Sequence, residues 1–221
     1  RKYLIDENTM LAAGNCQTSQ AMAIYYNIFE PAERKAAFEQ LINLIEEKEY
    51  HLDVGVLGGR VLFHVLTDFG YSDLAFSMIT RPDYPSYGNW IARGATTLWE
   101  VFQPEDSDRI GSLNHHFWGD ISSWFTQALS GIRMAAHGEP NEVDFRPSFI
   151  SRLTHAEAFH IAPAGRIASA WERDEDDVIV LTVELPSTMH GVIRLESGYV
   201  FEDGLAYKAA ESGTYRIHSI E

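Results

Sequence analysis

The chain has 221 residues, 45% of them hydrophobic and 22% charged, which excludes wholesale disorder and leaves room for one or two domains. The formal net charge of −15 argues against a nucleic-acid partner, because an acidic surface repels phosphate groups. The single cysteine, Cys16, excludes an intramolecular disulfide and is compatible with either cytoplasm or periplasm, and no apolar run reaches the length of a membrane span.

The first part of the chain has the periodicity of helices. Apolar spacing and the positions of Gly, Pro and Ser predict helices over residues 18–29, 31–50, 58–70 and 72–80. Pro31 suits a first helical turn, and Ser72 is the expected N-cap of the fourth helix. A longer helix is predicted over residues 117–138, with its end near Gly131.

The composition changes near residue 138, and the second part alternates in the manner of strands. Strands are expected within residues 166–177, 176–186, 190–204 and 213–220, separated by Ser-Gly and Asp-Gly turns. Residues 172–177, "ERDEDD", are expected to form a hairpin turn facing water. The fold class is therefore predicted as α+β, with a helical domain over residues 1–138 and a small antiparallel β-sandwich over residues 139–221.

The chain contains nine histidines but no recognisable metal motif. His115 and His116 are adjacent and would diverge on a helix, the His-Glu-x-x-His motif is absent, and Cys16 lacks a second cysteine. The sequence "GVLGGR" at 55–60 lacks the Lys-Ser/Thr of a phosphate loop, and no Gly-x-Ser-x-Gly elbow is present. Neither metal, nucleotide nor serine-nucleophile chemistry is therefore expected.

One interval combines aromatic side chains with carboxylates, histidines and an asparagine. Between residues 84 and 120 the chain carries Tyr84, Tyr87, Trp90, Trp99, Phe102, Phe117 and Trp118, together with Glu100, Asn114, His115, His116 and Asp120. Sugars present apolar C–H faces and hydroxyl edges, and glycoside hydrolysis needs two carboxyl groups beside the scissile bond. A sugar pocket and an ordinary aromatic core with solvated carboxylates are both compatible with this composition.

Two motifs in this interval are specific. The stretches "YPSYGNWIARGATTLWE" and "SLNHHFWGDISSWF" resemble those of the family 78 α-L-rhamnosidases, which are inverting glycoside hydrolases. A looser similarity begins at "QTSQAMAIYYNIF" and continues through "HLDVGVLGG" to "HAEAFHIAPAGRIASAWERD", so the resemblance spans most of the chain. It implies that residues 1–138 form part of an (α/α)6 barrel and that residues 139–221 form the C-terminal β-sandwich.

The resemblance also implies a candidate site. Glu100 matches the general base of the family, and His115 matches the histidine that contacts the sugar. Tyr87 is expected to line the pocket, where Tyr87 or Trp99 would supply an apolar wall for the methyl group of rhamnose. Trp99 and Asn114 match further motif positions and are grouped with the substrate-binding residues. The expected substrate is a rhamnose-containing glycoside or polysaccharide, and no metal or organic cofactor is implied.

Other carboxylates have less specific roles. Asp53 is a second candidate for the pocket, whereas Glu105, Asp106 and Asp108 are expected in a solvated loop, with the pocket rim as the alternative. The motif that carries the family's general acid, similar to Cys-Pro-Gln-Arg-Asp-Glu, is absent. The expectation is therefore a C-terminal portion that carries the base but not the acid, is inactive alone, and has the missing N-terminal part of the same enzyme as its partner.

Two other functions stay open at this point. The chain could be a non-catalytic carbohydrate-binding or interaction protein with the same fold. It could also be another (α/α)6-barrel glycosidase in which Asp53 or Asp120 acts as the acid.

Overall fold

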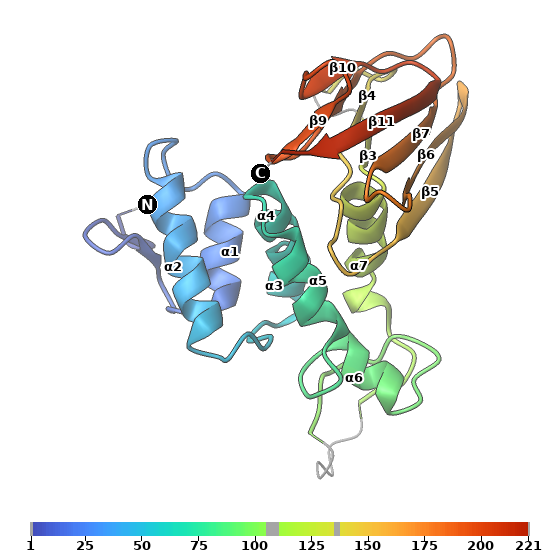
Figure 1. Cartoon of the computed structure of the whole chain (residues 1–221). Helices are drawn as coiled ribbons and strands as arrows, with labels where there is room; N and C mark the ends of the chain where they lie inside the picture. The colour runs from blue at the N-terminus through green and yellow to red at the C-terminus, as the bar shows by residue number, and fades with distance from the viewer. Residues whose placement is uncertain (1, 105–110, 135–137, 221) are drawn as a thin grey trace. The chain divides into compact units, whose positions relative to one another are not determined.

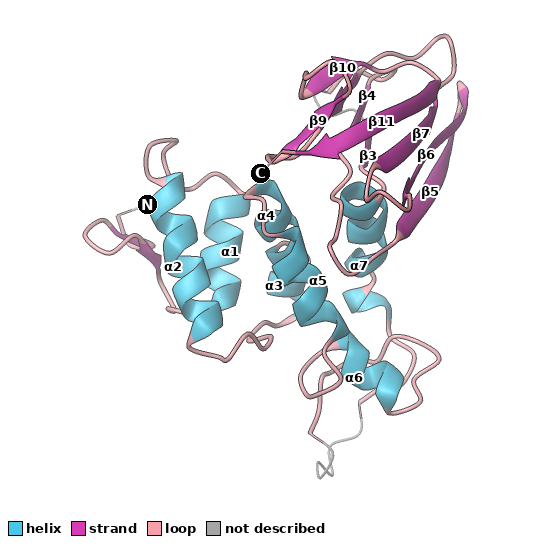
Figure 2. Cartoon of the chain, in the orientation of Figure 1, coloured by secondary structure: helices cyan, strands magenta, loops and turns pink. Residues whose placement is uncertain are grey.

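The computed structural model describes residues 2–104, 111–134 and 138–220. Its contacts divide the chain into two units, Arg1–Ile121 and Ser122–Glu221 (Figure 1). Helices dominate the first unit and strands the second, so the predicted succession of helices and antiparallel sheets is confirmed (Figure 2). Within the described residues, no helix combines the length and the apolar character needed to cross a membrane.

The first unit begins with a short hairpin and continues as helices. Its elements are β1 (Ile5–Asp6), β2 (Leu11–Ala12), α1 (Gln17–Tyr25), α2 (Arg34–Glu46), α3 (Val56–Gly59), α4 (Leu62–Asp68), α5 (Ser72–Thr80), α6 (Tyr87–Ala92) and the 3-10 turn η1 (His116–Trp118). All four predicted helical segments before residue 81 contain helices; the fourth has the predicted bounds, and the helices within the first three are shorter than predicted. Helix α5 begins at Ser72, and Tyr71 is its N-cap. Ser72, the predicted N-cap, is therefore the first residue of the helix.

The long helix predicted over residues 117–138 is wrong in its length. The segment consists of η1, the short helix α7 (Asp120–Trp124) and the π-helical turn η2 (Phe125–Leu129), and it ends before Gly131 as expected. Gly131 has a positive φ of 78°, and β3 (Ile132–Met134) follows it directly. The turn η2 belongs with the strands, because the indole of Trp171 donates a hydrogen bond to the Leu129 carbonyl (2.7 Å). The division of the chain therefore precedes the boundary predicted at residue 138.

A buried glutamine connects the hairpin to the first two helices. Gln20, on α1, is fully buried. Its amide oxygen accepts a hydrogen bond from the backbone N–H of Ala12 (2.7 Å). Its amide nitrogen donates to the carbonyl oxygens of Met10 (2.9 Å) and Ala37 (2.8 Å). One side chain thus satisfies buried backbone groups of the β2 region and of α2, whose apolar residues pack against α1.

The second unit contains two sheets that share one hydrophobic core. The four-stranded sheet has the order β10 (Tyr207–Ala209), β8 (Val192–Arg194), β4 (Val143–Phe145), β3. The five-stranded sheet has the order β5 (His155–Ala162), β6 (Gly165–Arg173), β7 (Ile179–Glu184), β11 (Gly213–Ser219), β9 (Tyr199–Phe201). Buried side chains from both sheets, among them Phe145, Trp171 and Leu181, form this core. All named pairs are antiparallel except β4 with β8, which is parallel.

The polar turn predicted at residues 172–177 is confirmed. It connects β6 to β7, and the Asp174 carboxylate accepts hydrogen bonds from the backbone N–H groups of Asp176 (3.0 Å) and Val178 (2.9 Å). Glu175, Asp176 and Asp177 are exposed, as a hairpin turn facing water requires.

We expect Gln20→Met to lower the free energy of unfolding by about 2–4 kcal/mol, because two buried backbone groups and one partly buried backbone group lose their partner. Urea denaturation followed by far-UV circular dichroism measures the change. Gln40→Met is the matched control on α2, where the glutamine hydrogen bond to Asn43 is long (3.3 Å) and exposed, and it should stay within about 0.5 kcal/mol of the wild type. Equal stability of the two variants would contradict the role given to Gln20.

Candidate active site

Two segments, residues 97–101 and 111–118, lie against one another and carry four of the predicted site residues, Trp99, Glu100, Asn114 and His115. The backbone N–H of Glu100 donates to the Ser112 carbonyl (2.8 Å), and that of His115 donates to the Leu98 carbonyl (2.8 Å). The two sequence motifs are thus paired in space, as well as close along the chain. We call these two segments the Glu100 loop pair.

The carboxylate of Glu100 is held at the partly exposed end of this loop pair. Its Oε2 accepts a hydrogen bond from the Ser112 backbone N–H (2.8 Å), which fixes the orientation of the side chain. Gly111 packs closely on the first segment, because a Cβ at that position would lie 3.1 Å from Val101 Cγ2. The carboxylate is therefore positioned by backbone groups of the second motif.

His115 and Asn114 lie on the opposite segment of the loop pair. The Nδ1 atom of His115 accepts a hydrogen bond from the Phe117 backbone N–H (3.4 Å), so the other ring nitrogen is the one that can donate. The His115 ring packs edge-on against Phe117, with centroids 4.1 Å apart. Asn114 is exposed. Its backbone N–H donates a hydrogen bond to Ser112 Oγ, and its carbonyl oxygen accepts one from the same hydroxyl group.

An aromatic cluster contacts the loop pair through Trp118. The indole N–H of Trp118 donates to the carbonyl oxygen of Glu100 (2.9 Å). Trp118 contacts Trp90 and Phe102, which stack on each other at 4.3 Å. A Cβ on Gly59 would lie 2.5 Å from the Trp118 ring, so a glycine is needed for the indole to pack against α3. Trp118 thus joins α3 and the cluster to Glu100.

Tyr87 and Trp99, both predicted to face substrate, differ in their exposure. Tyr87 is 7% exposed, and its hydroxyl donates to the Trp118 carbonyl (3.3 Å), which supports a packing role. Burial raises the pKa of Tyr87, and the negative charge of Asp120 adds to this effect. Trp99 is partly exposed, and the Arg93 guanidinium lies 5.3 Å from its ring centroid.

Asp53, the other candidate carboxylate, has its partners outside the loop pair. Asp53 is exposed and forms an ion pair with Lys48 (3.3 Å), while its backbone N–H donates to Gln17 (3.0 Å). Its location therefore gives no support to a pocket role. Glu105, Asp106 and Asp108 lie outside the described residues.

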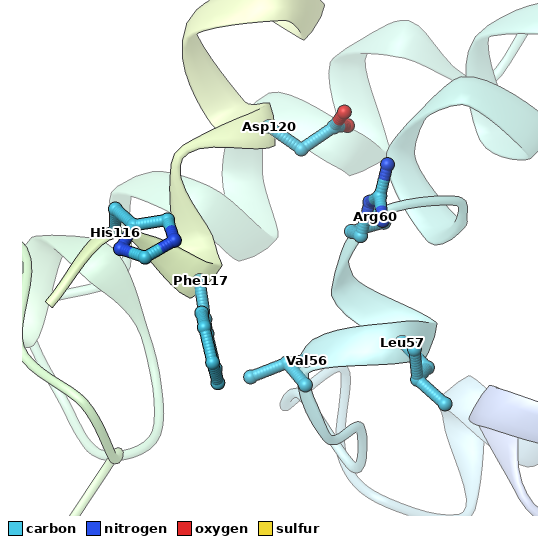
Figure 3. A pocket seen from close by; sticks show the side chains of 6 residues that line it. All are labelled: Val56, Leu57, Arg60, His116, Phe117 and Asp120. Carbon is cyan, nitrogen blue, oxygen red and sulfur yellow. The ribbon is translucent and has the colours of Figure 1, made fainter.

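A cavity of about 450 Å³ lies beside the second segment of the loop pair (Figure 3). Its lining consists of Val56, Leu57, Arg60, His116, Phe117 and Asp120. Figure 3 shows the Asp120 carboxylate and the Arg60 guanidinium pointing toward one another, with His116 and Phe117 on one side and α3 on the other. The lining combines apolar and charged groups, which is typical of small-molecule sites.

The sequence indicates only half of this cavity. His116, Phe117 and Asp120 belong to the interval rich in aromatics and carboxylates, whereas Val56, Leu57 and Arg60 lie in residues 55–60, for which no binding role is expected. The one available signal was the charged Arg60 directly before an apolar helix. Across the described ranges, no three His, Cys, Asp or Glu side chains are grouped in a way that would hold a metal ion.

Comparison with known families identifies the class of protein. Residues 1–129 match the bacterial α-L-rhamnosidase 6-hairpin glycosidase domain, and residues 141–198 match the bacterial α-L-rhamnosidase C-terminal domain. The chain therefore belongs to the bacterial α-L-rhamnosidase family. The predicted boundary at residue 138 lies between the two matches, whereas the contacts divide the chain after Ile121.

Individual relatives agree with this assignment. An α-L-rhamnosidase of Streptomyces avermitilis is 29% identical over 92% of this chain and 21% of its own length. An α-L-rhamnosidase of Alteromonas sp. (strain LOR) is 27% identical over the whole of this chain and 25% of its own length. The crystal structure of the Streptomyces avermitilis enzyme complexed with L-rhamnose has a TM-score of 0.82 and 27% identity over 98% of this chain and 22% of that one. The chain thus spans about a fifth to a quarter of the length of these relatives.

We expect Gly59→Ala to lower the free energy of unfolding by about 1–3 kcal/mol and to alter the tryptophan emission, because the added Cβ displaces the Trp118 indole. Urea denaturation followed by fluorescence measures both effects. Gly55→Ala is the matched control at the N-cap of the same helix, where a Cβ meets nothing within 4 Å, and its cost should stay below about 1 kcal/mol. A Gly59→Ala variant as stable as the control would mean that the indole does not need this contact.

We expect the stability of the folded chain to fall as the pH rises above about 10, in part through Tyr87. Its pKa is raised in the folded state, so above that pH the unfolded chain loses the phenolic proton while the folded chain keeps it. Unfolding then releases a proton and becomes more favourable with increasing pH. The free energy of unfolding of Tyr87→Phe should therefore decline less steeply than that of the wild type in urea titrations across this range. Parallel slopes would show that the phenol ionises equally in both states.

Proposed function

We propose that this chain takes part in the hydrolysis of terminal α-L-rhamnosides, with Glu100 as the general base. The observation that carries the proposal is the geometry of the Glu100 loop pair in a chain that belongs to the rhamnosidase family. There the Glu100 carboxylate is oriented by the Ser112 N–H and partly exposed, next to the segment that carries His115. The proposed substrates are glycosides or polysaccharides with terminal α-L-rhamnose.

The proposed mechanism inverts the anomeric centre. Glu100 removes a proton from a water molecule that attacks the anomeric carbon, while a general acid protonates the leaving oxygen on the other side. The two carboxyl groups of an inverting enzyme lie about 6.5–9.5 Å apart, so that the water fits between the base and the sugar. The donor nitrogen of His115 binds a hydroxyl group of the sugar, and the partly exposed Trp99 and exposed Asn114 contribute to the same pocket.

We further propose that the first unit is part of an (α/α)6 barrel and that the second is the β-sandwich that follows it. The helical hairpin character of the first match and the shared core of the two sheets support this assignment. The chain spans about a fifth to a quarter of its relatives, and the motif expected around the general acid is absent from it. The acid is accordingly proposed to come from a part of the enzyme outside these 221 residues, and the chain alone to be inactive.

We expect Glu100→Gln, in an enzyme that contains this chain and the general-acid region, to lower kcat for p-nitrophenyl α-L-rhamnoside by about 10²- to 10⁴-fold with little change in KM. The amide keeps the size of the side chain but cannot accept the proton. Glu39→Gln, on an exposed position of α2, is the matched control and should keep wild-type turnover.

Two results would contradict the proposal. Full turnover by Glu100→Gln would remove Glu100 from the role of base. Release of α-L-rhamnose as the first product, observed by proton NMR, would be incompatible with inversion, which yields the β anomer.

A further inference from the structure

A second group of polar side chains, apart from the Glu100 loop pair, meets at the cavity. His64 Nε2 and Asp120 Oδ2 lie 2.9 Å apart, and because the carboxylate accepts, Nε2 carries the proton. The side chains of His64 and Asp120 are 13% and 25% exposed, so the pair is largely shielded from bulk water. The hydrogen bond fixes one oxygen of Asp120, and Oδ1 is a second acceptor on the same group.

The charge of Asp120 acts on its surroundings. Burial raises the pKa of Tyr25, and the negative charge of Asp120 is the next largest cause. The positive charge of Arg60 acts on Tyr25 in the opposite direction. Tyr25 and Tyr87 therefore both have Asp120 as an electrostatic neighbour, and Arg60 belongs to the same cluster.

The cavity has the chemical character of a sugar site. Val56, Leu57 and Phe117 provide an apolar surface for the C–H face of a ring. Asp120 supplies an acceptor and Arg60 a donor, and Figure 3 shows the two groups pointing toward one another. Two adjacent hydroxyl groups match this pair, since one donates to the carboxylate and the other accepts from the guanidinium. An anionic ligand is disfavoured by Asp120 and by the net charge of −15.

We propose that this cavity is a sugar subsite in which Asp120 and Arg60 bind adjacent hydroxyl groups of the substrate and His64 holds Asp120 in position. The inference rests on the proposed function, because it takes the rhamnoside as the ligand. The bound ring is either the rhamnose itself or the sugar to which the rhamnose is attached, because both present adjacent hydroxyl groups. His116, next to His115, forms part of the wall of this subsite.

The experiment compares kcat and KM of Asp120→Asn and the wild type in an enzyme that contains this chain and the general-acid region. The two substrates are p-nitrophenyl α-L-rhamnoside, whose only sugar is rhamnose, and a rhamnosyl-glucose disaccharide. We expect kcat/KM to fall by about 10- to 100-fold through KM, because a charge-assisted hydrogen bond to the sugar is lost. A loss on both substrates identifies the rhamnose ring as the ligand, and a loss on the disaccharide alone identifies the attached sugar.

Two variants of His64 separate positioning from folding, and a variant of Arg60 tests the second polar group. His64→Leu removes the donor to Asp120 and should reproduce the KM effect of Asp120→Asn, whereas His64→Gln keeps an N–H donor and should restore most of the affinity. Arg60→Gln tests the opposite wall of the cavity and does not touch the His64–Asp120 pair. It should raise KM on the same substrate as Asp120→Asn.

The matched control is a second histidine–aspartate pair outside the cavity. His51 Nε2 and Asp83 Oδ2 lie 2.8 Å apart, and the Asp83 side chain is 51% exposed. Asp83→Asn should leave kcat and KM unchanged. Wild-type KM values for both Asp120→Asn and Arg60→Gln, in an enzyme that Glu100→Gln inactivates, would overturn the subsite and leave the proposed function intact. Failure of the wild type to cleave either substrate would overturn both.

Discussion

The hydrogen bond from the Trp118 indole to the Glu100 carbonyl is the interaction on which the candidate site depends. Glu100 lies in a segment without regular secondary structure, so its position is set by what that segment is attached to. Trp118 supplies the attachment, because its ring is enclosed by Trp90, Phe102 and Gly59. A rigid aromatic wall thus orients a loop carboxylate, which is how a reactive group on a loop obtains a fixed geometry.

Trp118 connects the two parts of the site. It donates a hydrogen bond to the Glu100 carbonyl of the loop pair and packs against Gly59 of α3, the helix whose residues Val56 and Leu57 line the cavity. The proposed base and the proposed sugar subsite therefore share Trp118 as a structural support.

The amount that could be predicted from the sequence differs between these parts. Glu100 and His115 lie in continuous motifs, and the pairing of those motifs agrees with what their short separation suggests. The His64–Asp120 pair joins residues 56 positions apart, and no local pattern indicates that they meet. Likewise, most helices followed from apolar spacing, but the division of the helix predicted over residues 117–138 into η1, α7 and η2 did not. There Trp171, far along the chain, binds the Leu129 carbonyl, so packing against strands decides the local structure.

The parallel pairing of β4 with β8 has a consequence for how the second unit is built during synthesis. Strands β5, β6 and β7 are joined by short turns, so each needs only its neighbour in the chain in order to pair. Strand β4 precedes all three, yet its partner β8 follows them, and Phe145 meets Ile193 only after the intervening chain has emerged. The four-stranded sheet therefore closes late over a hairpin layer that already exists, and until then the apolar side chain of Phe145 has no completed core to enter.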